Sequence, residues 1–405
     1  MPISFYEARQ KILDCVPLLD IEKVPLLEAA GRAVAKDIIA TQVLPAFTNS
    51  AMDGYAVLAE NCSAKTILTV KGFLPAGSKA MNRVQPRTAI RVMTGAPIPQ
   101  GADAVVPFED CLEGEGKITI QHTVKKGDNI RWAGEDIRPG DQVISAGTLL
   151  RPTEISVLAS LRISAVPVHR RVRVAILATG DELQDINELY FEGGVVNSNS
   201  WALAAAVREI NAIPLLLGIA RDNLADIRDK INEGLRADVL ITSAGVSSGD
   251  RDLVREVLQE FKVQEQFWKV NIKPGLPTAF AMHNKVPVFS LPGNPVSTML
   301  TFEEFVRPAL LKMMGHHTVF KALHKATLTE PLKKKAGRLQ ILRVAVTIDP
   351  HGEMLVSSAG DQNTGILRTS IAARGVALLD AERDFFAAGD KIDVHLFGAS
   401  TALGY

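Results

Sequence analysis

Apolar positions change their spacing several times along the 405 residues, and each change predicts a different kind of structure. Residues 4–16 have helical spacing, with Ser4 as N-cap and Glu7 as its capping-box partner, and the helical pattern continues to about the fortieth residue. Short β-prone runs broken by Gly, Pro and Asp turns follow. We therefore expect an N-terminal helical region over 1–42 and an inserted, mostly β module over 43–140.

The next part of the chain alternates short apolar runs with amphipathic stretches. One helical stretch, TEISVLASL, falls in a linker segment over 141–170. Within 171–318 the alternation predicts an α/β domain, with a largely parallel sheet covered by helices on both faces. The pattern then returns to β, which predicts a small C-terminal barrel or sandwich over 319–405. The strand candidates of the α/β part are VRVAIL, IPLLLGI, ADVLIT and VPVFSL, and its helix candidates are SWALAAAVREIN, NLADIRDKINEGL, DLVREVLQEF and the stretch from VSTML to LLKMM.

Polar, glycine-containing strings follow directly on three of these strand candidates. They are TGDEL, TSAGVSSGD and SLPGNPVS. In a parallel sheet the carboxyl ends of the strands meet at one edge, and ligands bind there. We therefore expect these distant segments to form one site.

The loop TSAGVSSGDRD combines small residues with two carboxylates. Ser247, Ser248 and Gly249 let backbone N–H groups approach an anion beside a helix N-terminus. Asp250 and Asp252 would repel a bare phosphate but suit one accompanied by Mg²⁺. A tight turn with aspartate as helix N-cap explains the same residues, and both interpretations remain open. The loop matches neither the Walker pattern nor GxGxxG.

Charged residues also stand near other strand ends. Asp181 and Glu182 in ATGDEL suit metal coordination or general base catalysis, although helix capping explains one acidic residue equally well. Lys269 and Lys273 in WKVNIKPG are compact point charges suited to phosphate or another tetrahedral oxyanion. The alternative for each lysine is an ordinary surface position.

Turn geometry alone explains several other strings. In SLPGNPVS the prolines fix the turn, and a substrate role for Pro292, Gly293 and Asn294 is secondary. In the β module the strings NSAMDGYAV, MTGAPIPQGADAVV and NIRWAGEDIRPGD are all compatible with β-turns. Their chemical candidates are Asp53, Thr94, Arg131, Glu135 and Asp136.

Composition limits the class of protein. The 45 basic residues balance the 45 acidic ones, so neither nucleic acid nor an anionic membrane surface is an expected partner. Cys15, Cys62 and Cys111 form no CxxC pair, which disfavours a disulfide framework or a structural zinc site. The N-terminus lacks the pattern of a signal peptide, and no apolar run is long enough to span a membrane. We expect a cytoplasmic enzyme or scaffold.

Taken in order, the strings form a specific series. NSAMDGYA, TGAPIP, GEDI, ATGDEL, SAGVSSGDRD, KPG and LPGNPVS resemble the motifs of the molybdopterin molybdenumtransferase family, which includes MoeA and the gephyrin E-domain. The resemblance covers essentially the whole chain. It implies a multidomain α/β plus β fold: a three-layer molybdopterin-binding-like α/β domain, a β module inserted after the N-terminal helix, and a C-terminal β barrel.

The resemblance also implies an activity. The family inserts molybdenum from molybdate into adenylylated molybdopterin and releases AMP with the help of a divalent cation, here expected to be Mg²⁺. The family forms elongated dimers, so we expect a homodimer in which the β module of one subunit meets the α/β domain of the other. Other molybdenum cofactor synthesis proteins are further expected partners.

Matching motif to motif gives a set of site residues. The implied catalytic residues are Asp53, Glu182, Asp252, Lys269 and Lys273. The expected metal ligands are Asp181, Glu182, Asp250 and Asp252, of which the match supplies Glu182 and Asp252 and the loop chemistry supplies the other two. The expected substrate-binding residues are Thr94, Asp136 and Asp222 in ARDN from the match, and Arg131, Ser247, Ser248, Gly249, Pro292, Gly293 and Asn294 from the strings themselves.

The chain departs from the family pattern at several positions. KPGLP has Leu276 where a second lysine is common, Asn197 replaces a frequent aspartate, and Ala244 replaces a frequent glycine. GDQNTGILRTS matches the C-terminal serine-rich signature loosely, with Arg338, Arg343, Thr364 and Ser370 as candidates.

Two alternatives remain beside the transferase. One is the adenylyltransferase that makes its substrate, which resembles residues 172–314 alone. The other is a scaffold or a divergent molybdopterin-binding protein without transferase activity. NSAMDGYA and the C-terminal β domain disfavour the adenylyltransferase, and the retained acidic positions disfavour a scaffold.

Overall fold

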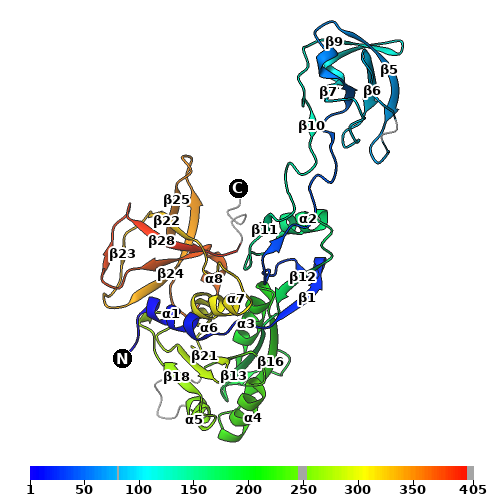
Figure 1. Ribbon diagram of the computed structural model, residues 1–405. Coiled ribbons are helices and arrows are strands. Elements are labelled where there is room, and N and C mark those ends of the chain that lie inside the picture. Colours follow the sequence, from blue (N-terminus) through cyan, green and yellow to red (C-terminus); the bar gives the residue numbers. More distant parts are fainter. Residues whose placement is uncertain (80–81, 245–252, 399–405) are drawn as a thin grey trace.

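The computed structural model describes residues 1–79, 82–244 and 253–398. Figure 1 shows a body, built from an α/β domain and a C-terminal β domain, and a small β module that stands away from it at the end of an extended arm. The chain leaves the body near its N-terminus, forms the module, and returns through the same arm. The module is therefore an insertion, as the sequence predicts.

The N-terminus begins with helix α1 (Phe5–Cys15). The capping box is present: Ser4 Oγ accepts the Glu7 N–H at 3.2 Å, and the Glu7 carboxylate accepts the Ser4 N–H at 3.4 Å. The expected helical pattern up to residue 40 is wrong beyond α1, because the alternating, proline-containing run IEKVP is a strand paired with a later one.

The linker region joins residues from both sides of the insertion. Two antiparallel pairs hold it together, and their apolar side chains share one small core with a helix. Its elements are β1 (Ile21–Pro25) paired with β12 (Ala165–His169), the 3-10 turn η1 (Leu26–Ala29), β2 (Ile38–Ile39) paired with β11 (Gln142–Ile144), and helix α2 (Pro152–Ser160).

The module consists of strands, short 3-10 turns and loops, whereas the arm is irregular apart from one isolated bridge between Leu44 and Ile137. β3 (Asn49–Ser50) pairs with β10 (Ile130–Arg131) where the arm enters the module, and Ile130 packs in the module's core. The module is a six-stranded sheet curled around its own apolar core. Its strand order is β7 (Ala104–Pro107), β4 (Gly54–Val57), β6 (Thr88–Val92), β5 (Ile67–Leu74), β9 (Lys117–Ile120) and β8 (Cys111–Gly114), with turns η2 (Ala59–Asn61) and η3 (Phe108–Asp110).

A six-stranded sheet forms the centre of the α/β domain. Its order is β16 (Ile213–Ala220), β13 (Arg173–Thr179), β17 (Val239–Ser243), β21 (Val286–Leu291), β20 (Ala279–His283) and β18 (Gln264–Phe267). The first four, which the apolar runs predict, are parallel. The last two extend the sheet antiparallel and were not predicted.

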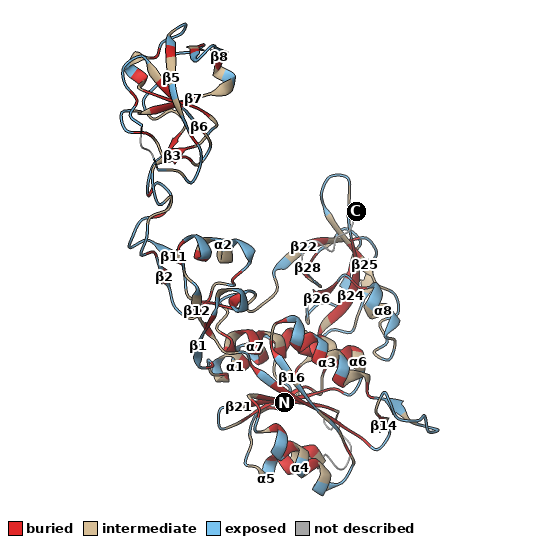
Figure 2. Cartoon of the chain, turned by 90° about the vertical axis from the view of Figure 1, so that its right-hand side faces the viewer, coloured by how far each residue is buried: buried red, intermediate tan, exposed pale blue. Residues whose placement is uncertain are grey.

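Helices cover both faces of this sheet, which confirms the three layers (Figure 2). One face packs against α4 (Leu224–Gly234) and α5 (Leu253–Glu260). The other packs against α1, α3 (Ser198–Glu209), α6 (Pro295–Thr301), the π-helical turn η4 (Phe302–Val306) and α7 (Arg307–Met313). A short parallel pair, β14 (Leu183–Gln184) and β15 (Val195–Val196), closes an exposed loop beside the sheet.

The C-terminal domain is a closed barrel rather than a sandwich. Each of five strands pairs with two neighbours, in the cyclic order β24 (Leu339–Ile348), β25 (Met354–Ser358), β22 (Leu323–Leu328), β28 (Lys391–Leu396) and β26 (Gly375–Leu379). The remaining elements are β19 (Ile272–Lys273) added to β24, the pair β23 (Leu332–Lys333) and β27 (Phe385–Phe386), and helix α8 (Arg368–Ala372).

A buried charged cluster ties the N-terminal helix and the barrel to the α/β domain. Glu304, in η4, is 2% exposed and pairs with Arg9 of α1 and, at 3.2 Å, with His395 Nδ1 of β28. Although burial alone would raise it, the pKa of Glu304 is held below its usual value by the His395 hydrogen bond and the Arg9 charge. The body is thus joined by paired charges as well as by apolar packing.

Candidate functional site

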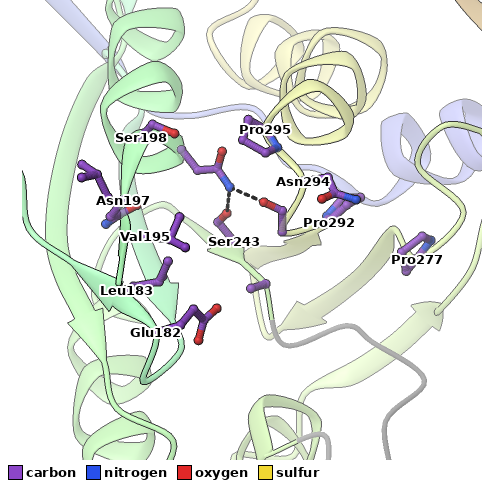
Figure 3. A pocket seen from close by; sticks show the side chains of 14 residues that line it. Glu182, Leu183, Val195, Asn197, Ser198, Ser243, Pro277, Pro292, Asn294 and Pro295 are labelled. Atoms are coloured by element: carbon purple, nitrogen blue, oxygen red, sulfur yellow. Dashed lines mark hydrogen bonds between the residues drawn. The ribbon is translucent and has the colours of Figure 1, made fainter. Parts of the chain in front are cut away.

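The strands that lead into the three glycine-containing strings end side by side at the carboxyl edge of the sheet. Backbone register aligns Ala178 with Ser243 and Ser243 with Leu291, and the string after β17 is described only as far as Ala244. Described residues at these strand ends line a cavity of about 480 Å³, hereafter the edge cavity (Figure 3). Its lining combines one carboxylate with amides, hydroxyls and apolar side chains: Glu182, Leu183, Val195, Val196, Asn197, Ser198, Asn199, Ser243, Ala244, Pro277, Pro292, Gly293, Asn294 and Pro295.

Glu182 stands at the rim of the edge cavity because of the turn that precedes it. Gly180 has φ +144°, a conformation that favours glycine, and a Cβ added there would lie 2.4 Å from Glu182 Oε2. The Glu182 carboxylate therefore folds back over a position that must lack a side chain. Its own side chain is exposed, so it is available to a ligand.

Asp181 and Asp222 join two neighbouring loops instead of lining the cavity. The Asp222 N–H donates to Asp181 Oδ1 at 3.1 Å, and the Asp181 N–H donates to Asp222 Oδ2 at 3.4 Å. Arg221 Nη1 adds bonds to the carbonyls of Asp181 and Leu183 at 3.3 and 2.8 Å. One oxygen of each carboxylate thus already accepts a backbone N–H. These two bonds help to hold the loop that carries Glu182 in place.

The SLPGNP turn is fixed by its own helix. Thr298 Oγ1 donates to the Pro292 carbonyl at 2.5 Å, and the Thr298 N–H donates to the Asn294 carbonyl at 2.9 Å. Asn294 is the N-cap of α6 without a side-chain cap bond, and the residue is exposed. Pro292, Gly293 and Asn294 all line the edge cavity, together with Glu182.

Asn199 and Ser243 line the same cavity and were not selected from the sequence. Asn199 Nδ2 donates to Ser243 Oγ at 2.9 Å and to the Gly293 carbonyl at 2.8 Å. The first asparagine of the NSNS string, Asn197, accepts the Ser200 N–H as helix N-cap. One capping asparagine, Asn197, is enough to explain the start of α3. The second asparagine of NSNS, Asn199, was therefore the feature of the sequence that could have indicated a role in the site.

Lys273 lies beside a different cavity, of about 430 Å³, between the α/β domain and the barrel. Arg343, which is 2% exposed, shapes the wall of this junction cavity. Its guanidinium donates to the carbonyls of Asp361, Asn363 and Ile366 and to Ser370 Oγ, at 3.0–3.3 Å. Arg343 and Ser370 therefore hold the 361–370 loop in place, while Thr364 and the exposed Lys273 line the cavity itself.

The other lysine and arginine candidates have more local roles. Lys269 is half-buried, its carbonyl accepts the Ile3 N–H at 3.0 Å, and among the described residues it lines neither of these two cavities. The Arg338 carbonyl accepts a bond from Lys334 Nζ at 3.0 Å.

In the module, Asp53 and Thr94 form a close pair. Asp53 Oδ1 accepts the Thr94 N–H at 2.6 Å and the Thr94 hydroxyl at 2.7 Å. The backbone bond, followed by the hydroxyl bond, lowers the pKa of the Asp53 carboxyl. Asp53 is partly exposed. Both bonds use Oδ1, so Oδ2 is the oxygen that they leave available to a ligand.

The remaining module candidates are exposed. Arg131 is the strand partner of Asn49 where the arm enters the module, Glu135 accepts the Trp132 N–H at 2.7 Å, and the Asp136 N–H donates to the Leu44 carbonyl at 3.1 Å. Figure 2 shows the module far from β14, the short strand that directly follows Glu182. Within one chain, the structure does not bring the module candidates to Glu182.

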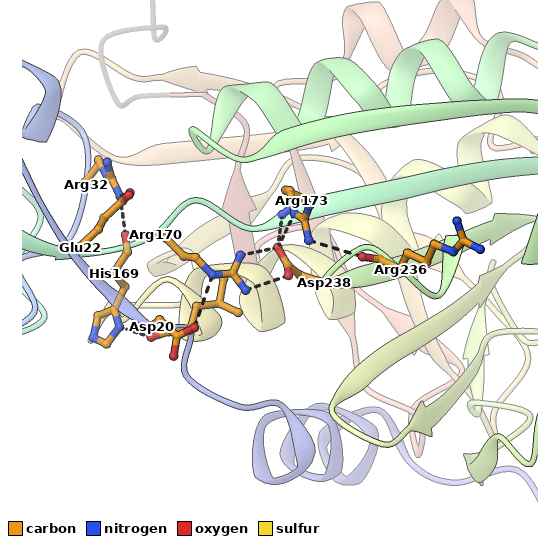
Figure 4. Close-up of polar contacts among 9 residues, drawn as sticks. Asp20, Glu22, Arg32, His169, Arg170, Arg173, Arg236 and Asp238 are labelled. Atoms are coloured by element: carbon orange, nitrogen blue, oxygen red, sulfur yellow. Dashed lines mark hydrogen bonds and ion pairs between the residues drawn. The ribbon is translucent and has the colours of Figure 1, made fainter. Parts of the chain in front are cut away.

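Charged contacts attach the linker region to the α/β domain (Figure 4). Arg170, just after β12, forms a bidentate pair with Asp238 at 2.6 and 2.8 Å, and the Arg173 N–H donates to the same carboxylate at 2.8 Å. Within the linker region, Arg32 pairs with Glu22 and donates to the His169 carbonyl at 2.7 Å. The region from which the arm extends is therefore held by oriented ion pairs.

Some predicted residues cannot be placed. Ser247, Ser248, Gly249, Asp250 and Asp252 lie outside the described residues. Within residues 1–79, 82–244 and 253–398, no group of three or more His, Cys, Asp or Glu side chains is arranged to hold a metal. In the same part of the chain, none of the helices is long and apolar enough to cross a membrane.

The cysteines are free. Burial raises the pKa of Cys62 to about 11 and that of Cys111 to about 12. Both thiols are therefore protonated at neutral pH, and neither is a suitable nucleophile.

Three family models match the chain in order: the MoeA N-terminal region (domain I and II) at residues 3–161, the probable molybdopterin binding domain at 175–312, and the MoeA C-terminal region (domain IV) at 325–397. Molybdopterin molybdenumtransferase of Haemophilus influenzae is 36% identical over 98% of both chains. Molybdopterin molybdenumtransferase 2 of Mycobacterium tuberculosis is 36% identical over 92% of this chain and 94% of its own.

A solved structure agrees with the sequence relatives. The molybdopterin biosynthesis moeA protein of Pyrococcus horikoshii OT3 superposes with a TM-score of 0.84 at 31% identity, covering 98% of this chain and all of that one. The resemblance inferred from the ordered motifs is confirmed. The chain belongs to the MoeA family of molybdopterin molybdenumtransferases.

Proposed function

We propose that this chain inserts molybdenum from molybdate into adenylylated molybdopterin and releases AMP. The observation that carries the proposal is the edge cavity, in which Glu182, Ser243 and the Pro292–Asn294 turn converge from three strand ends. Its apolar wall of Leu183 and Val195 suits a flat heterocycle. The carboxylate and amides at the rim suit polar ring edges and a charged linkage.

Charge complementarity supports the two anionic substrates. Lys273 supplies a cation at the junction cavity, where four protein acceptors already hold the Arg343 guanidinium. A tetrahedral dianion such as molybdate requires donors of this kind rather than carboxylates. We assign Lys273 to binding and orienting an oxyanion, and Glu182 to the side of the diphosphate linkage.

Glu182 is the described residue best suited to hold Mg²⁺, because it is an exposed hard oxygen donor at the cavity. Asp181 is next to it and has one oxygen not used by the Asp222 N–H. Mg²⁺ commonly takes one or two carboxylates and completes its shell with substrate phosphates and water, so a larger protein cluster is not required. When bound, the ion neutralises charge on the diphosphate oxygens.

We further propose a homodimer in which Asp53 of one subunit faces the edge cavity of the other. Two observations support it. Asp53 and Thr94 are prepared for a ligand but stand far from Glu182 in their own chain. In addition, α3 and the edge strand β16 expose an apolar patch formed by Trp201 and Leu216, which line one hollow of the surface.

The dimer proposal is testable by sedimentation. Leu216→Lys places a charge in the apolar patch, and we expect it to shift the protein toward monomer and to lower turnover. Leu323→Lys, at a similarly exposed leucine of the barrel, is the matched control and should leave the assembly unchanged. A wild-type chain that sediments as a monomer at the assay concentration would contradict the proposal.

The activity itself is tested by incubating the protein with adenylylated molybdopterin, molybdate and Mg²⁺. We expect AMP release together with active cofactor, scored by reconstitution of a molybdenum enzyme. Omitting molybdate or chelating the divalent cation should abolish the production of active cofactor. The proposal is wrong if neither product forms with Mg²⁺ or with any other divalent cation.

A further inference from the structure

The floor of the edge cavity is held together by one side chain. Asn199 lies in the first turn of α3. Its amide Nδ2 donates to Ser243 Oγ at 2.9 Å, at the end of β17, and to the Gly293 carbonyl at 2.8 Å, in the turn after β21. Figure 3 shows both bonds crossing between the three segments. A helix and two strand ends are thus joined at a single nitrogen.

The chemistry of these bonds requires an amide. A backbone carbonyl such as that of Gly293 only accepts, so the nitrogen of the Asn199 side chain must face it. The two N–H groups of Asn199 then serve the two acceptors, one each. Aspartate has no N–H to offer the carbonyl, and an apolar side chain of similar size can make neither bond.

The segments that Asn199 joins are closely packed and conformationally unusual. Ala244 has φ +77°, and its N–H donates to the Leu291 carbonyl at 3.1 Å. A Cβ added to Gly293 would lie 3.3 Å from the Ala244 Cβ. The Ala244 Cβ therefore packs directly against the Gly293 turn, and small displacements of either segment change the cavity floor.

We propose that Asn199 is a positioning residue for the transfer reaction, which holds the Ser243–Ala244 corner and the Gly293 turn at the separation that the bound substrate requires. The inference rests on the proposed function. Asn199 acts through these neighbours rather than on the reacting atoms. A displacement of about 1 Å at a site can cost about a hundredfold in rate, so a bond that fixes the floor acts mainly on turnover.

Asn199→Leu tests this inference, because leucine has a similar volume and no donor. We expect kcat to fall at least about tenfold, KM to change by less than about threefold, and the Tm to stay within a few degrees of wild type. Asn187→Leu, the same change at an exposed asparagine of the 184–195 loop, is the matched control and should leave kcat unchanged. A kcat for Asn199→Leu within twofold of wild type overturns the proposal.

Ser243→Ala removes only one of the two bonds and keeps the Gly293 bond. It should lower kcat by a few-fold, and the double variant with Asn199→Leu should be no slower than Asn199→Leu alone, because the two residues act as one unit. If Asn199→Leu does not fold, Ser243→Ala decides, and an unchanged kcat there counts against the proposal.

Amide hydrogen exchange supplies a readout that does not depend on activity. Loss of the Asn199 bonds should speed exchange at the Ala244 N–H, while exchange in β13 stays unchanged. If wild type shows no turnover, the proposed function fails, and this exchange comparison still decides the inference: equal protection of Ala244 in wild type and Asn199→Leu overturns it.

Discussion

Glu182 and Asp53 are both acidic residues in short turns, but their surroundings differ in kind. Glu182 borders a cavity to which three strand ends and α3 contribute side chains. Asp53 has one close polar partner, Thr94, in a module that stands away from the body. One region is enclosed by its own chain, whereas the other offers a prepared carboxylate to solvent.

This difference shows which part of the proposed active site one chain forms by itself. Parallel strands bring distant loops together without a partner, because their carboxyl ends share an edge. The inserted module has no such constraint, since only the arm connects it to the body. A shared site therefore requires the arm to hold the module in a defined orientation, and it requires a second subunit to bind the module.

The largest expected effect comes from removing the charged groups of the body. Glu182→Ala and Lys273→Ala should each lower turnover about a hundredfold, equivalent to about 3 kcal/mol of transition-state stabilisation, with the fold intact. Steady-state kinetics and circular dichroism measure both. Glu192→Ala, in the exposed loop of the same chain, is the control. Near-normal rates for both variants would mean that the residue assignment is wrong.

The next largest expected effect is a change in the free energy of unfolding with pH, and it arises near the linker region that joins the module to the body. His316 lies beside residues of the linker, and burial, followed by the charges of Arg307 and His169, lowers its pKa to about 4. In the unfolded chain His316 binds a proton near pH 6.5, whereas in the folded chain it does so only near pH 4. Its contribution to the free energy of unfolding is therefore fully present above pH 6.5 and is lost as the pH falls toward 4. Between pH 7 and 5 this one group should cost about 2 kcal/mol.

Denaturant titration at several pH values measures the effect of His316. His316→Gln removes the titrating group and should flatten the stability profile in this window. His351→Gln, at an exposed histidine of the barrel, should leave the profile as it is. If wild type and His316→Gln lose stability in parallel from pH 7 to 5, the assigned pKa is wrong.

The smallest effect concerns the cavity floor. Ala244 has φ +77°, which is strained for a residue with a Cβ, so Ala244→Gly should stabilise the fold by about 0.5 kcal/mol after the entropy of glycine is counted. Ala205→Gly, on the exposed side of α3, should destabilise it by about 1 kcal/mol. Thermal unfolding of the two variants should therefore shift in opposite directions, and shifts of the same sign would remove the strain argument.

Periodicity predicted the α/β core well because buried parallel strands are continuous apolar runs. All four of the apolar runs proposed as strands are parallel neighbours, and described residues at the carboxyl ends of three of them line the edge cavity. β18 was missed because QEQF is polar, and β20 because its pairing is set by the tight turn at Asn284, with φ +54°, rather than by its own pattern. The N-terminal strand β1 was missed because its partner β12 lies far away in the sequence.

The site could be predicted only as far as local spacing reaches. Strand-end logic located Glu182 and the Pro292–Asn294 turn. It did not predict that Lys273 lies at the junction cavity and not at the edge cavity. It also missed Asn199, whose role depends on two acceptors from other strands. The position of the module depends on the arm and on the ion pairs of the linker region from which the arm extends, and the β runs do not predict either.

Subunit complementation tests the central claim most directly. Asp53→Ala and Glu182→Ala are each expected to lose nearly all turnover, Glu182→Ala about a hundredfold as above, but a mixed dimer would combine one intact Asp53 with one intact Glu182 in a single site. Unfolding and refolding the two variants together at equal amounts should restore about a quarter of wild-type turnover, because half of the dimers are mixed and each has one working site. Activity no higher than that of the separate variants would contradict a site shared between subunits.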